Sequence, residues 1–413
     1  MRRVRHSTLF VRRSRLFGLF VAAALAAPTV AVGAPITETV VPGYSAGSNP
    51  DWIVTGPDGL VTVTMLSGPS ASQFVTFTGP KTVKKPVFCL YERKDCRSGG
   101  MAAGPNGIWF VTTIPINVKP VFANPGIGLL SGEIGTLVQQ LQVTDIPYGI
   151  AADRTGVLWI ALAQGVIVRY DPVALTVDRF SLAEYTNGPA LISLGADGAM
   201  WFTQKPGNKI GRIATEAPEL VGSVTQYNVP TPRAGVYGIA PGPDGATWFA
   251  ESRVGQIGRI ASDGSVQEFK TNVKGSTPRN LVAGPDNAMW FTDPGTNSIG
   301  RIAMDGKVTE YPLPASDVVA NKVPNAITLG GDGFIWFTEN NTGITTSSGK
   351  TTSPAVGRLD PMSPPTATTR TATTKKKLTA AQKKAAAKKK AAAKKRAAAK
   401  KKAAAKRKAA AKK

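Results

Sequence analysis

The sequence predicts an all-β fold, a seven-bladed β-propeller with four-stranded blades, and three patterns support it. A block that starts with a Gly-Pro-Asp-Gly turn and leads to Trp-Phe recurs along the chain, with a degenerate copy at residues 56–63. An Ile-Gly-Arg-Ile-like motif follows four of these blocks. Five tryptophans of the series are 42, 47, 42 and 46 residues apart, which suits one blade per copy, and they are Trp159, Trp201, Trp248, Trp290 and Trp336.

One copy is enough to predict the four strands of a blade. Residues 237–240 and 246–250 form the first two strands, joined by a turn in which Gly245 supplies a positive φ. Residues 257–260 and 266–269 form the third and fourth strands. The tryptophans are expected to pack against the neighbouring blade, and the arginines of the Ile-Gly-Arg-Ile motif are expected to pair within their own blade.

The ring needs a strand from the other end of the chain to close. The last copy supplies three strands and stops at Asp360-Pro361. Residues 36–42 resemble residues 308–314, which form a fourth strand in the preceding copy. Because an open sheet edge promotes aggregation, we expect the N-terminal strand to complete the last blade.

The chain divides into four segments. Residues 1–34 have the positive, apolar and small-residue regions of a signal peptide, so we expect an exported protein that is extracellular or associated with the cell envelope. An uncleaved anchor, and the choice between the general and the twin-arginine export routes, stay open. Residues 35–361 form the propeller, residues 362–374 a Pro/Thr linker, and residues 375–413 a basic tail.

The basicity of the chain belongs to its two ends. The formal net charge is +24, but the tail contains 19 Lys or Arg and the leader contains six arginines, which leaves 24 − 19 − 6 = −1 for the rest. The tail has almost no large apolar side chain to bury, so we expect it to be disordered alone. Its expected partner is a polyanion: a cell-wall polymer, anionic lipid, glycosaminoglycan or DNA. Tails of linker histones have a similar composition.

The only two cysteines are Cys89 and Cys96, and we expect them to form a disulfide in an oxidising compartment, with two free thiols as the alternative. The only histidine, His6, lies in the leader, so a zinc-type site beside the cysteines is not expected. The propeller itself is expected to be a monomer.

The motifs "GPDGATWFAE", "NKIGRI" and "GKVTEYPLP" resemble those of the streptogramin lyase (virginiamycin B lyase) family over residues 36–361. The resemblance implies a magnesium-assisted elimination that opens type B streptogramins, with a histidine base in a Pro-His-Gly-Ile motif and two nearby glutamates that help to hold the metal. The matching segment here has Asn325 in place of the histidine and Val323 in place of one glutamate, while Glu339 is kept. Arg279 replaces a second histidine. A neutral amide cannot accept a proton at neutral pH, so the family's mechanism is not expected unless a carboxylate acts as base.

The mouth of the propeller channel is the expected ligand site, for an unknown small molecule or protein. Three carboxylates on successive blades, one of which is the candidate catalytic Glu339, are expected to converge on Mg²⁺ or another divalent cation, with separate exposure as the alternative. Arg279 with two tyrosines suits an anionic or sugar-like ligand equally well. The candidate metal ligands are Glu251, Asp293 and Glu339, and the candidate ligand-binding residues are Tyr148, Gln204, Tyr237, Arg279 and Asn325.

Two functions follow, and the sequence leaves enzymatic activity open. The first is an exported propeller that binds a ligand or partner and is tethered to an anionic surface by its tail. The second is a metal-assisted lyase or hydrolase in which a carboxylate replaces the missing histidine. A third hypothesis is a protein that binds nucleic acid through its tail, and it would require the chain to escape export.

Overall fold

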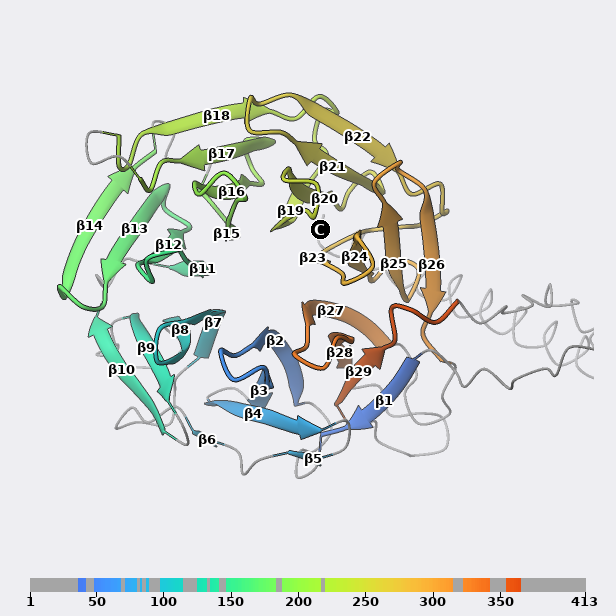
Figure 1. The fold of residues 1–413 in the computed structure, drawn as a ribbon, viewed down its shortest axis with the longest axis horizontal. Coiled ribbons are helices and arrows are strands. Elements are labelled where there is room, and N and C mark those ends of the chain that lie inside the picture. Colours follow the sequence, from blue (N-terminus) through green and yellow to red (C-terminus); the bar gives the residue numbers. More distant parts are fainter. Residues whose placement is uncertain are drawn as a thin grey trace, which may run out of the picture.

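The strands form a ring of seven sheets (Figure 1). The computed structural model describes residues 36–41, 48–67, 71–79, 82–83, 87–88, 97–113, 125–131, 134–140, 146–182, 188–216, 220–314, 322–341 and 354–364. In these ranges the regular structure is all β, and no helix has the length and apolar character to cross a membrane. The predicted leader, most of the linker, the tail and both cysteines lie outside the described residues.

The first three blades follow one another around the ring, each running from an inner to an outer strand. In the first blade β6 (Val87–Phe88) also pairs with β4. The first blade contains β2 (Asn49–Thr55), β3 (Val61–Ser67), β4 (Ala71–Gly79) and β5 (Thr82–Val83). The second contains β7 (Arg97–Gly104), β8 (Gly107–Thr113), β9 (Gly126–Ser131) and β10 (Ile134–Gln140). The third contains β11 (Pro147–Ala152), β12 (Leu158–Leu162), β13 (Val166–Asp171) and β14 (Thr176–Ser181).

The next three blades repeat the predicted pattern closely, and the seventh takes its outermost strand from the N-terminus. The fourth blade contains β15 (Ile192–Leu194), β16 (Met200–Gln204), β17 (Lys209–Ile213) and β18 (Val224–Asn228), and the fifth contains β19 (Val236–Pro241), β20 (Thr247–Glu251), β21 (Gln256–Ile260) and β22 (Val266–Lys270). The sixth contains β23 (Leu281–Ala283), β24 (Ala288–Asp293), β25 (Ser298–Ala303) and β26 (Val308–Pro312). The seventh contains β27 (Lys322–Leu329), β28 (Ile335–Asn341), β29 (Ala355–Leu359) and β1 (Ile36–Val40).

The predicted closure of the ring is confirmed. Strand β1 pairs antiparallel with β29, from Ile36 opposite Leu359 to Val40 opposite Ala355. Ile36 is buried with the core of the last two blades, where it joins Leu313 and Phe337. The N-terminal strand therefore covers an edge that would otherwise expose unpaired backbone groups.

A carboxylate at the inner hairpin turn organises four of the blades. Asp244 accepts hydrogen bonds from Trp248 Nε1 at 2.9 Å and from Arg259 Nε at 2.6 Å. The positive φ of +77° at Gly245 forms the turn, as predicted. Burial alone would raise the pKa of Asp244, but the tryptophan and arginine donors outweigh it and lower that pKa. The same triad occurs as Asp197, Trp201 and Arg212; as Asp286, Trp290 and Arg301; and as Asp332, Trp336 and Arg358.

Each repeated tryptophan joins its blade to the next one. Trp248 is fully buried and packs with Met289 and Ile302 of the sixth blade. Its ring also stacks on Phe269 of its own outer strand, with centroids 5.5 Å apart. The prediction that the tryptophans are core residues is therefore confirmed, and the interface between blades is an aromatic and aliphatic layer.

In five blades the third strand needs glycine for the same close packing, at Gly128, Gly211, Gly258, Gly300 and Gly357. A Cβ on Gly258 would lie 2.1 Å from the ring of Phe249, which occupies the neighbouring strand. The Ile-Gly-Arg-Ile motif therefore combines a glycine that admits the phenylalanine ring with an arginine that holds the turn aspartate.

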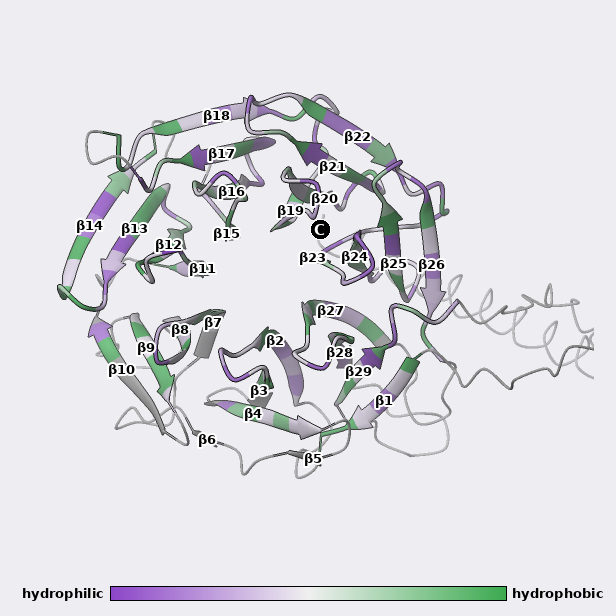
Figure 2. Cartoon of the chain, viewed as in Figure 1, coloured by the Kyte–Doolittle hydropathy of each residue, from purple (hydrophilic) through white to green (hydrophobic). Residues whose placement is uncertain are grey.

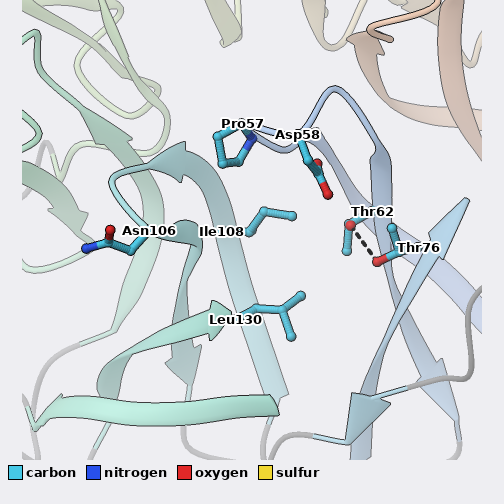
Figure 3. A pocket seen from close by; sticks show the side chains of 8 residues that line it. Pro57, Asp58, Thr62, Thr76, Asn106, Ile108 and Leu130 are labelled. Atoms are coloured by element: carbon cyan, nitrogen blue, oxygen red, sulfur yellow. Dashed lines mark hydrogen bonds between the residues drawn. The ribbon is translucent and has the colours of Figure 1, made fainter. Parts of the chain in front are cut away.

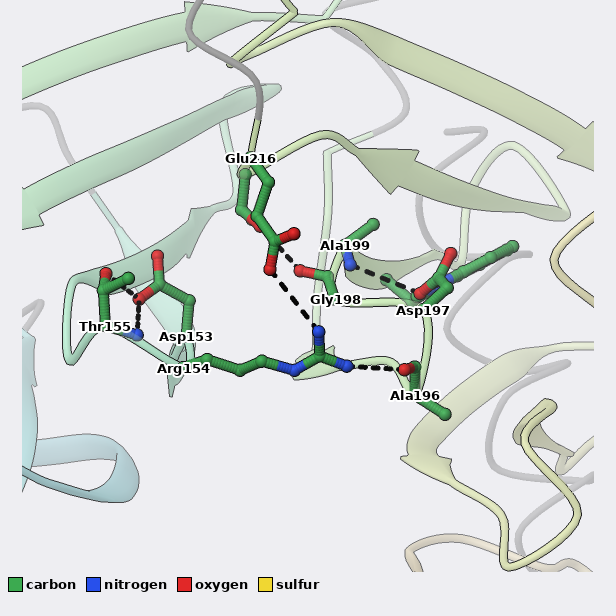
Figure 4. Close-up of polar contacts among 10 residues, drawn as sticks. Asp153, Arg154, Thr155, Ala196, Asp197, Gly198, Ala199 and Glu216 are labelled. Atoms are coloured by element: carbon green, nitrogen blue, oxygen red, sulfur yellow. Dashed lines mark hydrogen bonds and ion pairs between the residues drawn. The ribbon is translucent and has the colours of Figure 1, made fainter.

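The outer strands carry many polar residues, and a second kind of contact joins two blades at their inner hairpin turns. Figure 2 shows hydrophilic residues along the outer strands β14 and β22. Arg154 reaches from the third blade to the fourth, where it donates to the carbonyl oxygen of Ala196 at 2.6 Å and pairs with Glu216 at 3.5 Å (Figure 4). Both charged side chains are more than half exposed, so this bridge adds little stability.

Candidate functional site on the inner strands

The inner strands carry a repeated irregularity that sets the positions of the candidate ligand-binding residues. The pairing of β2, β7, β11, β19 and β27 with the second strand of each blade shifts register near its start. A bulge of this kind turns one side chain away from the regular alternation of the strand. The side chains at these shifts include Asp51, Tyr148, Tyr237 and Asn325.

Neighbouring inner strands then touch through their backbones. The amide of Gly238 donates to the carbonyl oxygen of Arg279 at 2.9 Å. A Cβ on Gly238 would lie 2.2 Å from that oxygen, so only glycine permits the contact. This approach places Tyr237 of the fifth blade directly beside Arg279 of the sixth.

Two cations flank the Tyr237 ring, and we call Lys205, Tyr237 and Arg279 the Arg279 site. Arg279 donates to the Tyr237 hydroxyl at 3.1 Å, and its guanidinium carbon lies 4.9 Å from the ring centroid. The Lys205 ammonium lies 5.3 Å from the same centroid. Arg279 Nε is buried without a hydrogen-bond partner. Within the described residues neither cation forms an ion pair with a carboxylate, in contrast to the arginines of the triads.

Asn325 is committed to holding the inner strands together. Its side-chain amide donates to the Asp51 carbonyl oxygen at 3.0 Å and to Asp51 Oδ1 at 3.3 Å. Its backbone carbonyl accepts from Asn280 Nδ2 and from Thr292 Oγ1. Asn325 is only 5 % exposed, so it joins the sixth, seventh and first blades rather than offering a free side chain.

The four candidates at the ends of the second strands are buried. Gln204, Glu251 and Asp293 are 0 % exposed and Glu339 is 1 % exposed. Asp293 accepts from Ser276 Oγ at 2.5 Å and from the amide of Thr277 at 2.7 Å, which ties it to the loop before its own inner strand. These side chains therefore lie beneath the inner surface, while Tyr148 is 48 % exposed.

The three carboxylates do not converge. Among the described residues there is no group of three or more Asp, Glu, His or Cys side chains placed to hold a metal ion. Each carboxylate occupies the end of its own second strand, and Glu251 and Asp293 are engaged by side chains or amides of their own loops. Among the described residues, Glu251, Asp293 and Glu339 therefore do not form one three-carboxylate cluster.

Glu251 has a different property, because burial raises its pKa to about 7. Gln256 Nε2 donates to Glu251 Oε2 at 3.0 Å and partly opposes that shift, while the charge of Glu268 adds to it. Glu251 Oε1 has no hydrogen-bond partner. A buried carboxyl with this pKa exchanges a proton near neutral pH.

Two residues of this site were missed in the sequence. Asp51 lies in Pro50-Asp51-Trp52-Ile53, which matches Pro324-Asn325-Ala326-Ile327, so aligning the degenerate first copy would have found it. Lys205 directly follows Gln204 and has no repeat signature of its own. Its position beside Tyr237 depends on the packing of the fourth blade against the fifth.

The model of the virginiamycin B lyase family matches residues 136–379, more than half of the chain. The chain belongs to this family. It is 42 % identical to a virginiamycin B lyase of Nocardia farcinica over 77 residues, which are 18 % of this chain and 26 % of that protein. The curated match therefore spans about a quarter of the length of that relative.

Solved structures of the family share the whole propeller. A streptogramin B lyase is 28 % identical, with a TM-score of 0.62 over 79 % of this chain and 97 % of the other. A catalytically inactive virginiamycin B lyase variant from Staphylococcus aureus, solved with quinupristin, is 25 % identical, with a TM-score of 0.63 over 78 % of this chain and 98 % of the other. Membership of the family thus rests on both sequence and fold.

The buried Glu251 generates a prediction about stability. The unfolded chain loses this proton near pH 4.5 and the folded protein near pH 7, so the free energy of unfolding falls as pH rises from about 4.5 to about 7. The penalty is fully present above pH 7 and amounts to at most ~3 kcal/mol. We expect Glu251→Gln to keep the bond from Gln256 and to raise the free energy of unfolding at pH 8 but not at pH 4.

Denaturant titrations at the two pH values measure this difference. The control is Glu216→Gln, since Glu216 has an exposed side chain and should show no such dependence on pH. Equal effects of Glu251→Gln at pH 4 and pH 8 would contradict the assignment.

Proposed function

We propose that this protein is an exported binding propeller that captures a small organic anion at the Arg279 site. The observation that carries the proposal is a partly buried guanidinium with no carboxylate partner. Arg212, Arg259, Arg301 and Arg358 each pair with an aspartate, and their charge is compensated inside the fold. The only described partners of the Arg279 side chain are a neutral hydroxyl and an aromatic ring.

The chemistry of the site favours a carboxylate. Guanidinium groups bind carboxylates through paired N–H donors, and such charge-assisted bonds are stronger than neutral ones. Arg279 Nε is a buried donor without an acceptor, which an incoming oxyanion would satisfy. Lys205 adds a second positive charge on the same tyrosine ring. A sugar acid combines a carboxylate for Arg279 with a ring that can lie against Tyr237.

The same site argues against the elimination that the family name suggests. The residue in the place of the expected base is Asn325, whose amide already donates to Asp51. Val323 cannot supply the missing carboxylate. Histidine, which commonly serves as the base in such reactions, is absent from residues 35–413. A buried carboxyl such as Glu339 or Glu251 is the alternative base for a metal-assisted lyase or hydrolase, and this remains the second candidate function.

The tail completes the proposal. Residues 375–413 carry 19 Lys or Arg and no acidic residue, so they bind polyanions through charge. In an exported protein, such a tail would hold the propeller at a cell-wall polymer or an anionic lipid surface. The near-neutral propeller would then be free to bind its ligand there.

Ligand binding is tested with glucuronate, and glucose serves as the neutral counterpart. We expect calorimetry with the full chain to detect glucuronate but not glucose, because only the acid compensates Arg279. Arg279→Gln should weaken binding about tenfold or more, the value of one charge-assisted hydrogen bond. Arg179→Gln, on the outer strand β14, is the matched control and should bind as the native chain does. Equal affinities of glucuronate for the native chain and Arg279→Gln would refute the site.

The alternative function is tested by turnover. The native chain and Glu339→Ala are incubated with a type B streptogramin and Mg²⁺, and the products are analysed by mass spectrometry. We expect no linearised product from either. Linear product from the native chain that is lost in Glu339→Ala would establish the carboxylate-dependent lyase and overturn the proposal of a binding protein.

Tethering is tested by sedimentation with lipid vesicles. We expect the full chain to sediment with vesicles that contain phosphatidylglycerol, and to be released as salt rises, because counterions screen the tail. A chain that ends at residue 374 should stay in the supernatant. Retention of this shortened chain on the vesicles would show that the tail is not the tether.

A further inference from the structure

The first blade lacks two of the three groups that organise the inner turns of the fourth to seventh blades. Its turn aspartate, Asp58, is present, but the chain has Thr62 where the other blades have tryptophan. Thr62 pairs with Thr76 across strands β3 and β4, at the register where Trp248 pairs with Arg259 in the fifth blade. The first blade therefore keeps the acceptor of the triad and loses both of its donors.

A cavity lies where the tryptophan would be. It has a volume of about 220 Å³ and lies between the first and second blades (Figure 3). Asp58, Thr62 and Thr76 line it from the first blade, and Ile108 and Leu130 line it from the second. Ile108 pairs with Leu130 as Met289 pairs with Ile302, and those two residues are the ones that receive Trp248 in the fifth blade. The cavity thus matches the slot for an indole ring.

The space around the turn glycines independently supports the absence of an aromatic ring from this cavity. A Cβ on Gly242 would lie 2.3 Å from the ring of Trp248. At the equivalent position, Gly56, the three atoms nearest to a Cβ would belong to Asp58 and Ile108, and none of them is aromatic. The edge of the slot that tryptophan fills in the fifth blade is open in the first.

Asp58 has unused acceptor capacity in this cavity. Its recorded hydrogen bond, within the described part of the chain, comes from the Leu60 amide to Oδ1 at 3.0 Å. The two threonine hydroxyls bond to each other at 2.8 Å. In four other blades the equivalent carboxylate also accepts from an indole N–H and from a guanidinium. In those blades the guanidinium donates to Oδ2, and among the described residues no donor reaches Oδ2 of Asp58.

We propose that this cavity binds a flat aromatic group that carries a cationic N–H donor. The ring takes the place of the tryptophan between Ile108 and Leu130, and the cationic nitrogen donates to the Asp58 carboxylate as the missing indole and guanidinium would. The size is sufficient, because an apolar cavity of about 150 Å³ is known to hold benzene. The carboxylate supplies the charge selectivity, since a charge-assisted hydrogen bond is stronger than a neutral one.

Benzamidine is the probe, because it joins a benzene ring to an amidinium, and benzamide is its neutral isostere. We expect ligand-observed NMR with the full chain to detect benzamidine and to give at least tenfold weaker binding of benzamide. The basic tail repels a cation, so it does not contribute to this signal. Absence of benzamidine binding at millimolar concentration would overturn the proposal.

Two variants locate the binding. Asp58→Asn keeps an acceptor for the Leu60 amide but removes the charge, and it should weaken benzamidine about tenfold. Thr62→Trp should fill the slot, abolish binding and raise the midpoint of thermal unfolding. Asp305→Asn is the matched control, because Asp305 is an exposed turn aspartate that accepts from the Lys307 amide in the same way.

The outcomes separate this cavity from the Arg279 site. Arg279→Gln should leave benzamidine affinity unchanged, since Arg279 lies just before the inner strand β23 of the sixth blade, whereas the cavity lies between the first and second blades. If Thr62→Trp fails to fold, Asp58→Asn alone decides. Benzamidine affinity that is unaffected by Asp58→Asn, or lost equally in Asp305→Asn, would show that the cavity is not the site.

Discussion

A single carboxylate at the inner turn of four blades is the constraint on which most of the ring depends. By accepting from an indole and a guanidinium at once, it fixes the turn, the second strand and the third strand of its blade relative to one another. The indole it orients is also the group that packs on the next blade. One interaction thus sets both the shape of a blade and the angle between neighbours, and repeating it generates the ring.

The first and second blades show what happens where that constraint is relaxed. Trp109 of the second blade donates to the carbonyl oxygen of Pro105 instead of to a carboxylate. The first blade replaces tryptophan with threonine and contains the cavity. Where the repeat is kept, these groups pair with one another, whereas in the first blade the turn carboxylate lacks its indole and guanidinium partners. The Arg279 site follows the same logic, since it is an arginine outside the repeat that lacks an aspartate.

Much of the fold could be predicted from the sequence because the residues that shape each blade recur at regular spacing. The turn glycines, the paired arginines, the buried tryptophans and the closing N-terminal strand follow from residue type and spacing. The candidate site was harder to predict from the sequence. Sequence placed Glu251, Asp293 and Glu339 on equivalent positions, but the depth of burial and the separation of the three depend on blade packing. The pairing of Tyr237 with Arg279 depends on a bulge and a glycine contact between blades, which no local pattern encodes.

The closing strand β1 affects how the chain folds during and after its synthesis. Thr37 and Arg358 meet across 321 residues, so the first strand of the described residues pairs with the last one. Until the seventh blade has been made, the N-terminal segment has no partner, and the cooperative ring cannot form. Contacts between such distant positions slow folding, because the chain loses the entropy of a long loop before the stabilising contacts form. A ribosome that stalls in the last blade would therefore release an open arc of blades with two uncovered edges, which is a substrate for proteases and chaperones rather than a smaller propeller.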